Sequence, residues 1–161
     1  MDPVQRNPCQ IVVSVPDQEL RLFEEGRLLR SYDVSTAERG TGSEEGSYRT
    51  PLGRFTIREM IGGDTERGTV FKSRLPVGIW SSDEKVEDDL VVSRILWLDG
   101  IDDDNRNTYD RYIYIHGTNH ERRIGEALSH GCVRMMNADV IDLFDRVEVG
   151  TPVEIVGERP V

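Results

Sequence analysis

The sequence predicts a mainly β protein, folded as a single sandwich- or barrel-like domain with one helix late in the chain. Short runs of alternating or β-branched residues, separated by turn-forming residues, recur along most of the chain. Helical spacing of apolar residues is clear in one segment, near residues 138–147. A chain of 161 residues, 37% hydrophobic and 31% charged, fits one globular domain. We expect it at residues 10–156, between an N-terminal lead (1–9) and a C-terminal tail (157–161).

Strands are predicted from β-like runs that are bounded by turn residues. Their expected positions are residues 10–15, 19–23, 28–34, 54–60, 91–98, 111–115 and 152–156. Residues 24–27 join the second and third strands, and Gly26 supplies the positive φ of a hairpin turn. Residues 35–53 are polar and rich in Gly, Ser and Thr. A connection of that length inside a compact domain predicts a functional loop or flap.

The helix is predicted over residues 138–147 by its first turn and by its apolar face. Asn137 has a typical N-cap side chain, and Asp139 suits the positive end of the helix dipole. Met136 and Ile141 have the spacing of a hydrophobic staple. The apolar face is expected to contain Val140, Ile141, Phe144 and Val147.

The charge of the chain excludes some classes of partner. A formal net charge of −10 argues against general nucleic-acid binding and against docking to an anionic membrane surface.

No run of 18 or more apolar residues is present, so no transmembrane segment is predicted. Residues 1–6 lack the features of a signal peptide, which fits either a cytoplasmic protein or the mature domain of a longer precursor.

Two patterns raise the question of a bound metal ion. The Asp-rich residues 99–110 lack the spacing of a calcium-binding EF-hand loop and are expected to form a solvated turn. His116, His120, His130 and Cys132 offer four nitrogen and sulfur ligands for zinc. Their spacing matches no common structural zinc pattern, so neither a metal nor another cofactor is predicted.

The densest group of reactive side chains surrounds Cys132. This residue follows Gly131, whose lack of a side chain lets the backbone fold tightly and present the sulfur. A cysteine attacks a carbonyl as its thiolate, and an ordinary thiol with a pKa of about 8.5 is only a few per cent ionised at neutral pH. Either His116 or His130 could take the proton. In an extended segment, His130 would share a face with Cys132.

Neighbouring groups could complete a site for acyl transfer. The backbone amides of Gly131 and Cys132 could bind a tetrahedral oxyanion, and the Arg134 guanidinium could hold a carboxylate in bidentate fashion. A backbone carbonyl could fix the tautomer of the catalytic imidazole. Two alternatives without catalysis stay open from the residues alone: Cys132 as an inert buried residue, or a disulfide between Cys132 and Cys9 in the Pro-rich lead.

The same residues resemble the signature of the L,D-transpeptidase catalytic domain family of the YkuD type. The matching residues are His116-Gly117-Thr118 followed by Ser129-His130-Gly131-Cys132-Val133-Arg134-Met135. They are similar to the family's histidine–glycine pair and its Ser-His-Gly-Cys-(Ile/Val)-Arg run. Further similarity lies in the opening hairpin (11–36), in Thr50-Pro51-Leu52-Gly53 and in residues 149–153, so it covers roughly residues 10–156.

The resemblance implies roles for individual residues in a β-rich enzyme of the periplasm or cell envelope. Cys132 would be the nucleophile, His116 its base or thiolate partner, and Gly117 the residue whose carbonyl orients the imidazole. The expected supporting or oxyanion residues are Ser129, His130 and Gly131, and the expected substrate-binding residues are Tyr114, Thr118 and Arg134.

The resemblance also implies a reaction on the stem peptides of peptidoglycan, which would serve as donor and acceptor. Cys132 would attack the bond between the third residue and the fourth-position D-Ala, and the acyl group would pass to an amine to give a 3→3 crosslink. Carbapenem β-lactams would be covalent inhibitors. Water as acceptor would instead make an L,D-carboxypeptidase or a crosslink-cleaving hydrolase, and a non-catalytic wall-binding module is a further alternative.

Overall fold

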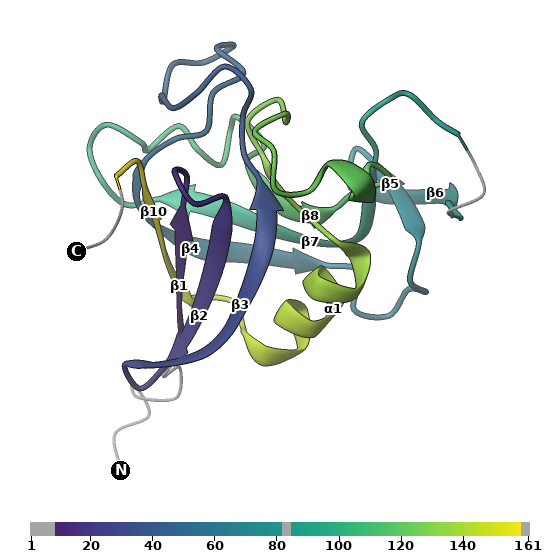
Figure 1. Cartoon of the computed structure of the whole chain (residues 1–161), viewed down its shortest axis with the longest axis horizontal. Coiled ribbons are helices and arrows are strands. Elements are labelled where there is room, and N and C mark those ends of the chain that lie inside the picture. Colours follow the sequence, from purple (N-terminus) through teal and green to yellow (C-terminus); the bar gives the residue numbers. More distant parts are fainter. Residues whose placement is uncertain (1–8, 82–84, 159–161) are drawn as a thin grey trace.

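A computed structural model of the chain describes residues 9–81 and 85–158. Within that part it is a β protein with one α-helix, as the sequence predicts (Figure 1). The strands are β1 (Cys9–Ser14), β2 (Glu19–Glu24), β3 (Arg27–Ser35), β4 (Gly53–Ile61), β5 (Thr69–Lys72), β6 (Leu75–Ile79), β7 (Val91–Gly100), β8 (Tyr114–Gly117), β9 (Val133–Met135) and β10 (Pro152–Val156). The helices are α1 (Asn137–Arg146) and a short 3-10 helix, η2 (Glu121–Arg123).

The strands belong to one sheet that closes on itself. Their order is β4-β10-β1-β2-β3-β9-β8-β7-β5-β6, and β4 also pairs with β7. The strands from β4 round to β7 therefore form a ring, which is the barrel-like architecture expected from the sequence and leaves no free edge within the ring. The β5–β6 hairpin projects from this ring, because β5 pairs with the start of β7 (Figure 1).

The inward-facing residues of the ring form the core, on which α1 packs. Strand β1 shows the alternation that this requires, with Cys9, Ile11 and Val13 buried. Helix α1 contributes Val140 and Leu143, both fully buried, and contacts β7 and β8. All four residues of β8 are buried. Strand β8, which contains His116, is thus held from both faces.

The predicted strands are present except at residues 111–113. These residues form a turn, because Tyr112 has a positive φ of 58° and the Arg111 amide donates to the Thr108 carbonyl at 3.2 Å. Strand β8 begins only at Tyr114 and runs on to Gly117. The sequence patterns also miss β5, β6 and β9.

Asn137 is not the N-cap of α1, contrary to the prediction. Met136 occupies that position and makes no side-chain capping bond, while the Glu121 carboxylate accepts from the Asn137 amide at 2.8 Å. Asn137 is the first helical residue, and its side chain is buried in contact with other elements. The apolar face of α1 is otherwise as predicted, with the addition of Leu143, which the sequence pattern did not assign to it.

Two smaller expectations are also corrected. Cys9 belongs to the domain and not to the lead, since it begins β1 and is buried. Residues 99 and 100 end β7, and residues 101–110 form a largely exposed turn that is anchored by Asn105, which is fully buried and donates to the carbonyls of Leu52 and Arg54. The rest of the lead and the end of the tail lie outside the described residues. In the described ranges, no helix is long and apolar enough to cross a membrane.

Candidate active site

Strands β8 and β9 bring the two halves of the reactive sequence together. They pair in parallel, with His116 opposite Arg134 and Gly117 opposite Met135. Side chains alternate along paired strands, so His116 and Arg134 lie on the same face of the sheet. Cys132 immediately precedes β9, and its sulfur accepts a hydrogen bond from the Tyr114 amide at 3.3 Å. Residues 18 positions apart thus become neighbours.

The Cys132 thiol is partly shielded and is held between two backbone groups. Besides accepting from the Tyr114 amide, Sγ donates to the Tyr112 carbonyl at 3.3 Å. Burial raises the pKa of Cys132 to about 11, and this effect outweighs the hydrogen bond from Tyr114 and the nearby charges of Arg111 and Arg134, which lower it. At neutral pH the sulfur therefore carries its proton and needs a base before it can attack.

His116 is suited to be that base. Its side chain is buried, at 3% exposure, and Nδ1 lies 2.5 Å from the Gly117 carbonyl oxygen. A carbonyl can only accept, so Nδ1 carries the proton and Nε2 keeps its lone pair. Burial lowers the pKa of His116, with a smaller opposing effect from Asp89. The imidazole is therefore neutral at pH 7 and able to accept a proton.

A buried polar network fixes the backbone at Gly117. A Cβ added there would lie 2.4 Å from the Val92 carbonyl and 2.5 Å from Asn137 Oδ1, so only glycine fits. Asn137 Nδ2 donates to the Thr118 carbonyl at 2.9 Å, and Asn137 Oδ1 accepts from the Ser93 hydroxyl at 2.7 Å. Ser93 has a positive φ of 71° inside β7, which is uncommon for a residue other than glycine.

The turn that presents Cys132 is held by hydroxyl groups. Ser129 Oγ donates to the Cys132 carbonyl at 2.6 Å and accepts from the Gly131 amide at 3.2 Å. Thr50 Oγ1 donates to the Gly131 carbonyl at 3.0 Å. Gly131 has a φ of 121°, and a Cβ there would lie 3.3 Å from the Arg49 carbonyl. Because the Gly131 amide already bonds Ser129, it is not free in this structure to bind an oxyanion.

His130 does not share a face with Cys132, contrary to the expectation for an extended segment. Residues 130–132 form a bend, His130 is exposed, and its ring packs edge-on against Tyr48 at 5.8 Å. The four candidate zinc ligands therefore do not converge. In residues 9–81 and 85–158, no three His, Cys, Asp or Glu side chains are grouped as a metal site.

Arg134 and Thr118 are buried and already have partners. Arg134 is 3% exposed, and Nη1 forms an ion pair with Asp89 Oδ1 at 3.1 Å. The Thr118 hydroxyl, which is fully buried, donates to the same carboxylate at 3.4 Å. Arg134 Nε is buried without a hydrogen-bond partner within the described residues, and the expected contacts of Arg134 and Thr118 with substrate stay predictions. Asp89 compensates the charge of Arg134 beside the buried histidine.

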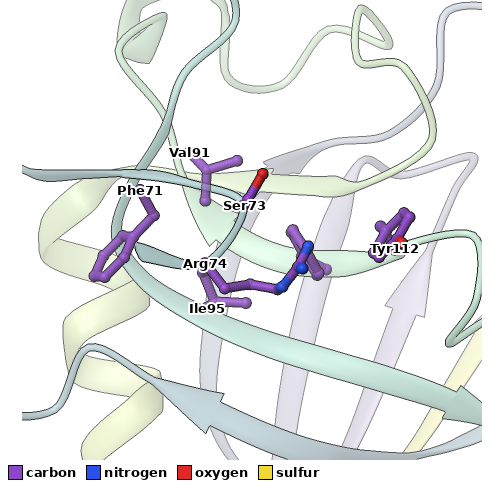
Figure 2. A pocket seen from close by; sticks show the side chains of 7 residues that line it. Phe71, Ser73, Arg74, Val91, Ile95 and Tyr112 are labelled. Atoms are coloured by element: carbon purple, nitrogen blue, oxygen red, sulfur yellow. The ribbon is translucent and has the colours of Figure 1, made fainter. Parts of the chain in front are cut away.

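A cavity of about 320 Å³ lies next to the residues that contact the Cys132 sulfur, and Figure 2 shows its lining. It is lined by Phe71, Ser73, Arg74, Val91, Ile95, Tyr112 and Tyr114. Tyr112 and Tyr114 supply both this lining and the backbone groups that contact the Cys132 sulfur. Of the expected substrate-binding residues, Tyr114 is thus the one that faces a cavity.

The sequence matches the family model of the L,D-transpeptidase catalytic domain over residues 9–155. The chain belongs to the L,D-transpeptidase family. A putative L,D-transpeptidase YkuD of Bacillus licheniformis is 30% identical over 148 residues, which make up 92% of this chain and 66% of that protein. The family prediction is therefore confirmed.

Solved L,D-transpeptidases share the fold. One from Mycobacterium smegmatis has a TM-score of 0.62 at 17% identity and covers 94% of this chain. LdtMt1, solved in complex with imipenem, has a TM-score of 0.58 at 20% identity and covers 93%. This chain spans 59% of each of those chains and about two thirds of the Bacillus relative.

Several residues at this L,D-transpeptidase site were missed in the sequence. Asp89 lies just before β7, and Ser93 lies near the start of β7. No local sequence pattern links either residue to the signature around Cys132. Arg111 was assigned to a strand, yet it donates to the Arg49 carbonyl at 2.8 Å and holds the loop beside Cys132. Arg74 lies in a hairpin that the sequence did not predict.

Proposed function

We propose that this protein is a peptidoglycan L,D-transpeptidase with Cys132 as its nucleophile. The observation that carries the proposal is the parallel pairing of β8 and β9. The Cys132 sulfur lies beside β8, the strand that contains the buried, neutral His116. Family membership supports the same chemistry. The substrate is a tetrapeptide stem, and the site of action is the periplasm or cell envelope.

In the first half of the reaction, His116 Nε2 takes the proton of the Cys132 thiol as the sulfur attacks the carbonyl of the third stem residue. The Cys132 amide is the proposed donor to the oxyanion. The bond to the fourth-position D-Ala then breaks, and His116 returns its proton to the leaving amine. A thioester on Cys132 remains.

In the second half, an amine of another stem attacks the thioester. His116 accepts a proton from this amine, the carbon–sulfur bond breaks, and the thiol regains its proton. The product is a 3→3 amide crosslink. The Gly117 carbonyl holds the imidazole in one tautomer throughout, since it accepts the Nδ1 proton.

Incubation of the purified protein with a disaccharide-tetrapeptide tests the proposal by mass spectrometry. The wild type is expected to form a crosslinked dimer with loss of one D-Ala, whereas Cys132→Ala forms none. Cys9→Ser is the matched control, because Cys9 is a free thiol in the core, and it should retain activity. Crosslinking by the Cys132→Ala variant would contradict the assignment of the nucleophile. Tripeptide and free D-Ala without dimer would identify water as the acceptor.

Carbapenems provide a second test of the nucleophile. LdtMt1 has been solved in complex with imipenem, and we expect imipenem to acylate Cys132 in this protein. Imipenem should give a stoichiometric mass adduct on the peptide that contains Cys132, and Cys132→Ala should give none. An adduct on the Cys9 peptide alone would contradict the proposal.

A further inference from the structure

The cavity beside Cys132 contains a guanidinium group that no carboxylate neutralises. Arg74 extends into this cavity in the direction of Tyr112 (Figure 2). Its Nη1 donates to the Tyr114 hydroxyl at 3.3 Å. Within residues 9–81 and 85–158, no Asp or Glu side chain lies close enough to form an ion pair with it. Arg134, the other arginine of the site, is by contrast paired with Asp89.

Aromatic rings and the turn of the β5–β6 hairpin hold Arg74 in place. Its guanidinium carbon lies 5.0 Å from the ring centroid of Trp97 and 5.0 Å from that of Tyr112. Both distances are within the range of cation–π attraction. Ser73 and Arg74 have positive φ values of 49° and 65°, the backbone of a two-residue hairpin turn, although neither is glycine. The side chain is thus positioned before any substrate binds.

We propose that Arg74 binds the terminal carboxylate of the donor stem, the carboxylate that leaves with the fourth residue. This role rests on the proposed function. One tyrosine residue separates the two groups, because Tyr114 contacts the Cys132 sulfur through its amide and Arg74 through its hydroxyl. The carboxylate of the fourth residue lies one peptide unit beyond the attacked carbonyl, and consecutive Cα atoms are about 3.8 Å apart. Because Tyr114 contacts both the sulfur and the guanidinium, the cavity that it lines is adjacent to the site of attack.

The Arg74 guanidinium and the stem carboxylate also match in hydrogen bonding and in charge. A guanidinium has five N–H donors, and one bond to Tyr114 leaves a pair for a bidentate carboxylate. The chain carries a net charge of −10, which repels an anionic stem unless a local cation compensates. Arg74 would therefore select donors whose chain ends at the fourth residue, and it would release its ligand when that residue departs.

A pair of donors that differ in this carboxylate tests the role of Arg74. The donors are the disaccharide-tetrapeptide and its C-terminal carboxamide, and kcat/KM for acyl-enzyme formation is measured with each. Wild type is expected to prefer the carboxylate roughly 10- to 100-fold, as expected for a hydrogen-bonded ion pair. Arg74→Gln should lose that preference by slowing the carboxylate donor alone, and Arg74→Lys should retain part of it. Lys72→Gln, on the same hairpin but outside the cavity lining, should behave as wild type.

The outcomes separate the two proposals. Equal turnover of both donors by the wild type, or an equal loss for both donors in Arg74→Gln, would overturn the role of Arg74, since a purely structural role slows both alike. Failure of the wild type to acylate with either donor would overturn the proposed function, and the role of Arg74 with it.

Discussion

Cys132 and His116 are both held in their neutral forms. Burial raises the pKa of the thiol to about 11 and lowers the pKa of the imidazole. A preformed thiolate–imidazolium pair would need the opposite shifts. The proton is therefore expected to move from sulfur to nitrogen when the substrate is attacked, and the buried site keeps both groups ready for that transfer.

This state predicts slow alkylation of Cys132. A shift from the ordinary 9.0 to about 11 leaves about 100-fold less thiolate at neutral pH. Iodoacetamide alkylation of the Cys9→Ser variant should be followed from pH 6 upward by mass spectrometry. The rate is expected to rise until well above pH 9. A midpoint below pH 7 would show a stable ion pair and contradict the neutral resting state.

At the scale of structural elements, the loop at residues 35–53 is tied to the turn that carries the nucleophile. Ala37 forms a β-bridge with Ser129, and Thr41 forms one with Thr50. Thr50 Oγ1 also accepts from the Ala37 amide at 2.9 Å and donates to the Gly131 carbonyl at 3.0 Å. The loop predicted to be a flap is therefore anchored at its base, and its position sets the position of the motif.

Removal of the Thr50 hydroxyl tests this coupling. Thr50→Val keeps the shape but leaves a buried amide and carbonyl without partners, which should lower the free energy of unfolding by about 1–3 kcal/mol. Imipenem acylation should slow at the same time, because the turn at Cys132 loosens. Urea unfolding and the rate of adduct formation measure the two effects.

Thr56→Val is the control, since this half-buried residue of β4 has no side-chain hydrogen bond within the described residues. An unchanged acylation rate in Thr50→Val would separate the loop from the site.

At the scale of the whole molecule, closure of the sheet joins segments that are far apart in sequence. Strand β4 pairs with both β10 and β7. Side-chain contacts add further links: Tyr32 in β3 donates to Asp142 in α1 at 2.7 Å, and Arg54 in β4 donates to Asp102, in the turn after β7, at 2.8 Å. Both carboxylates stabilise the fold in their ionised forms.

These carboxylates predict a loss of stability in acid. The hydrogen bond from Tyr32 lowers the pKa of Asp142, and bonds from Arg54 lower that of Asp102, both from about 3.8. Their contribution is present above pH 3.8 and is lost as the pH falls below it. The urea-derived free energy of unfolding should therefore drop as the pH falls below about 4. Asp142→Asn should reduce the drop by up to about 1 kcal/mol, because this side chain is partly exposed. Burial raises the pKa of Asp139, which opposes the trend. An identical drop in the variant would contradict the assignment.

Alternation and helical spacing predicted the fold class and the late helix, and the continuous signature predicted the family and gave Cys132, His116 and Gly117 as candidate catalytic residues. Those predictions rest on local properties of the sequence, namely alternation, helical spacing and a continuous signature. Such properties do not depend on contacts with distant parts of the chain. Local pattern could not predict the β5–β6 hairpin, since Ser73 and Arg74 adopt positive φ without a glycine to indicate it.

The contacts between side chains that are far apart in sequence became known only from the tertiary structure. Parallel pairing of β8 with β9 placed Arg134 beside His116, and Asp89 then neutralised it. Asn137 has the side chain of a cap, yet it supports the Gly117 backbone because Ser93 and Thr118 offer it buried partners. Arg74 lines the cavity, bonds the Tyr114 hydroxyl and has no carboxylate partner among the described residues. Charge compensation and burial depend on neighbours in space, so the mainly β fold follows from the sequence while the roles of its arginines follow from the closed sheet.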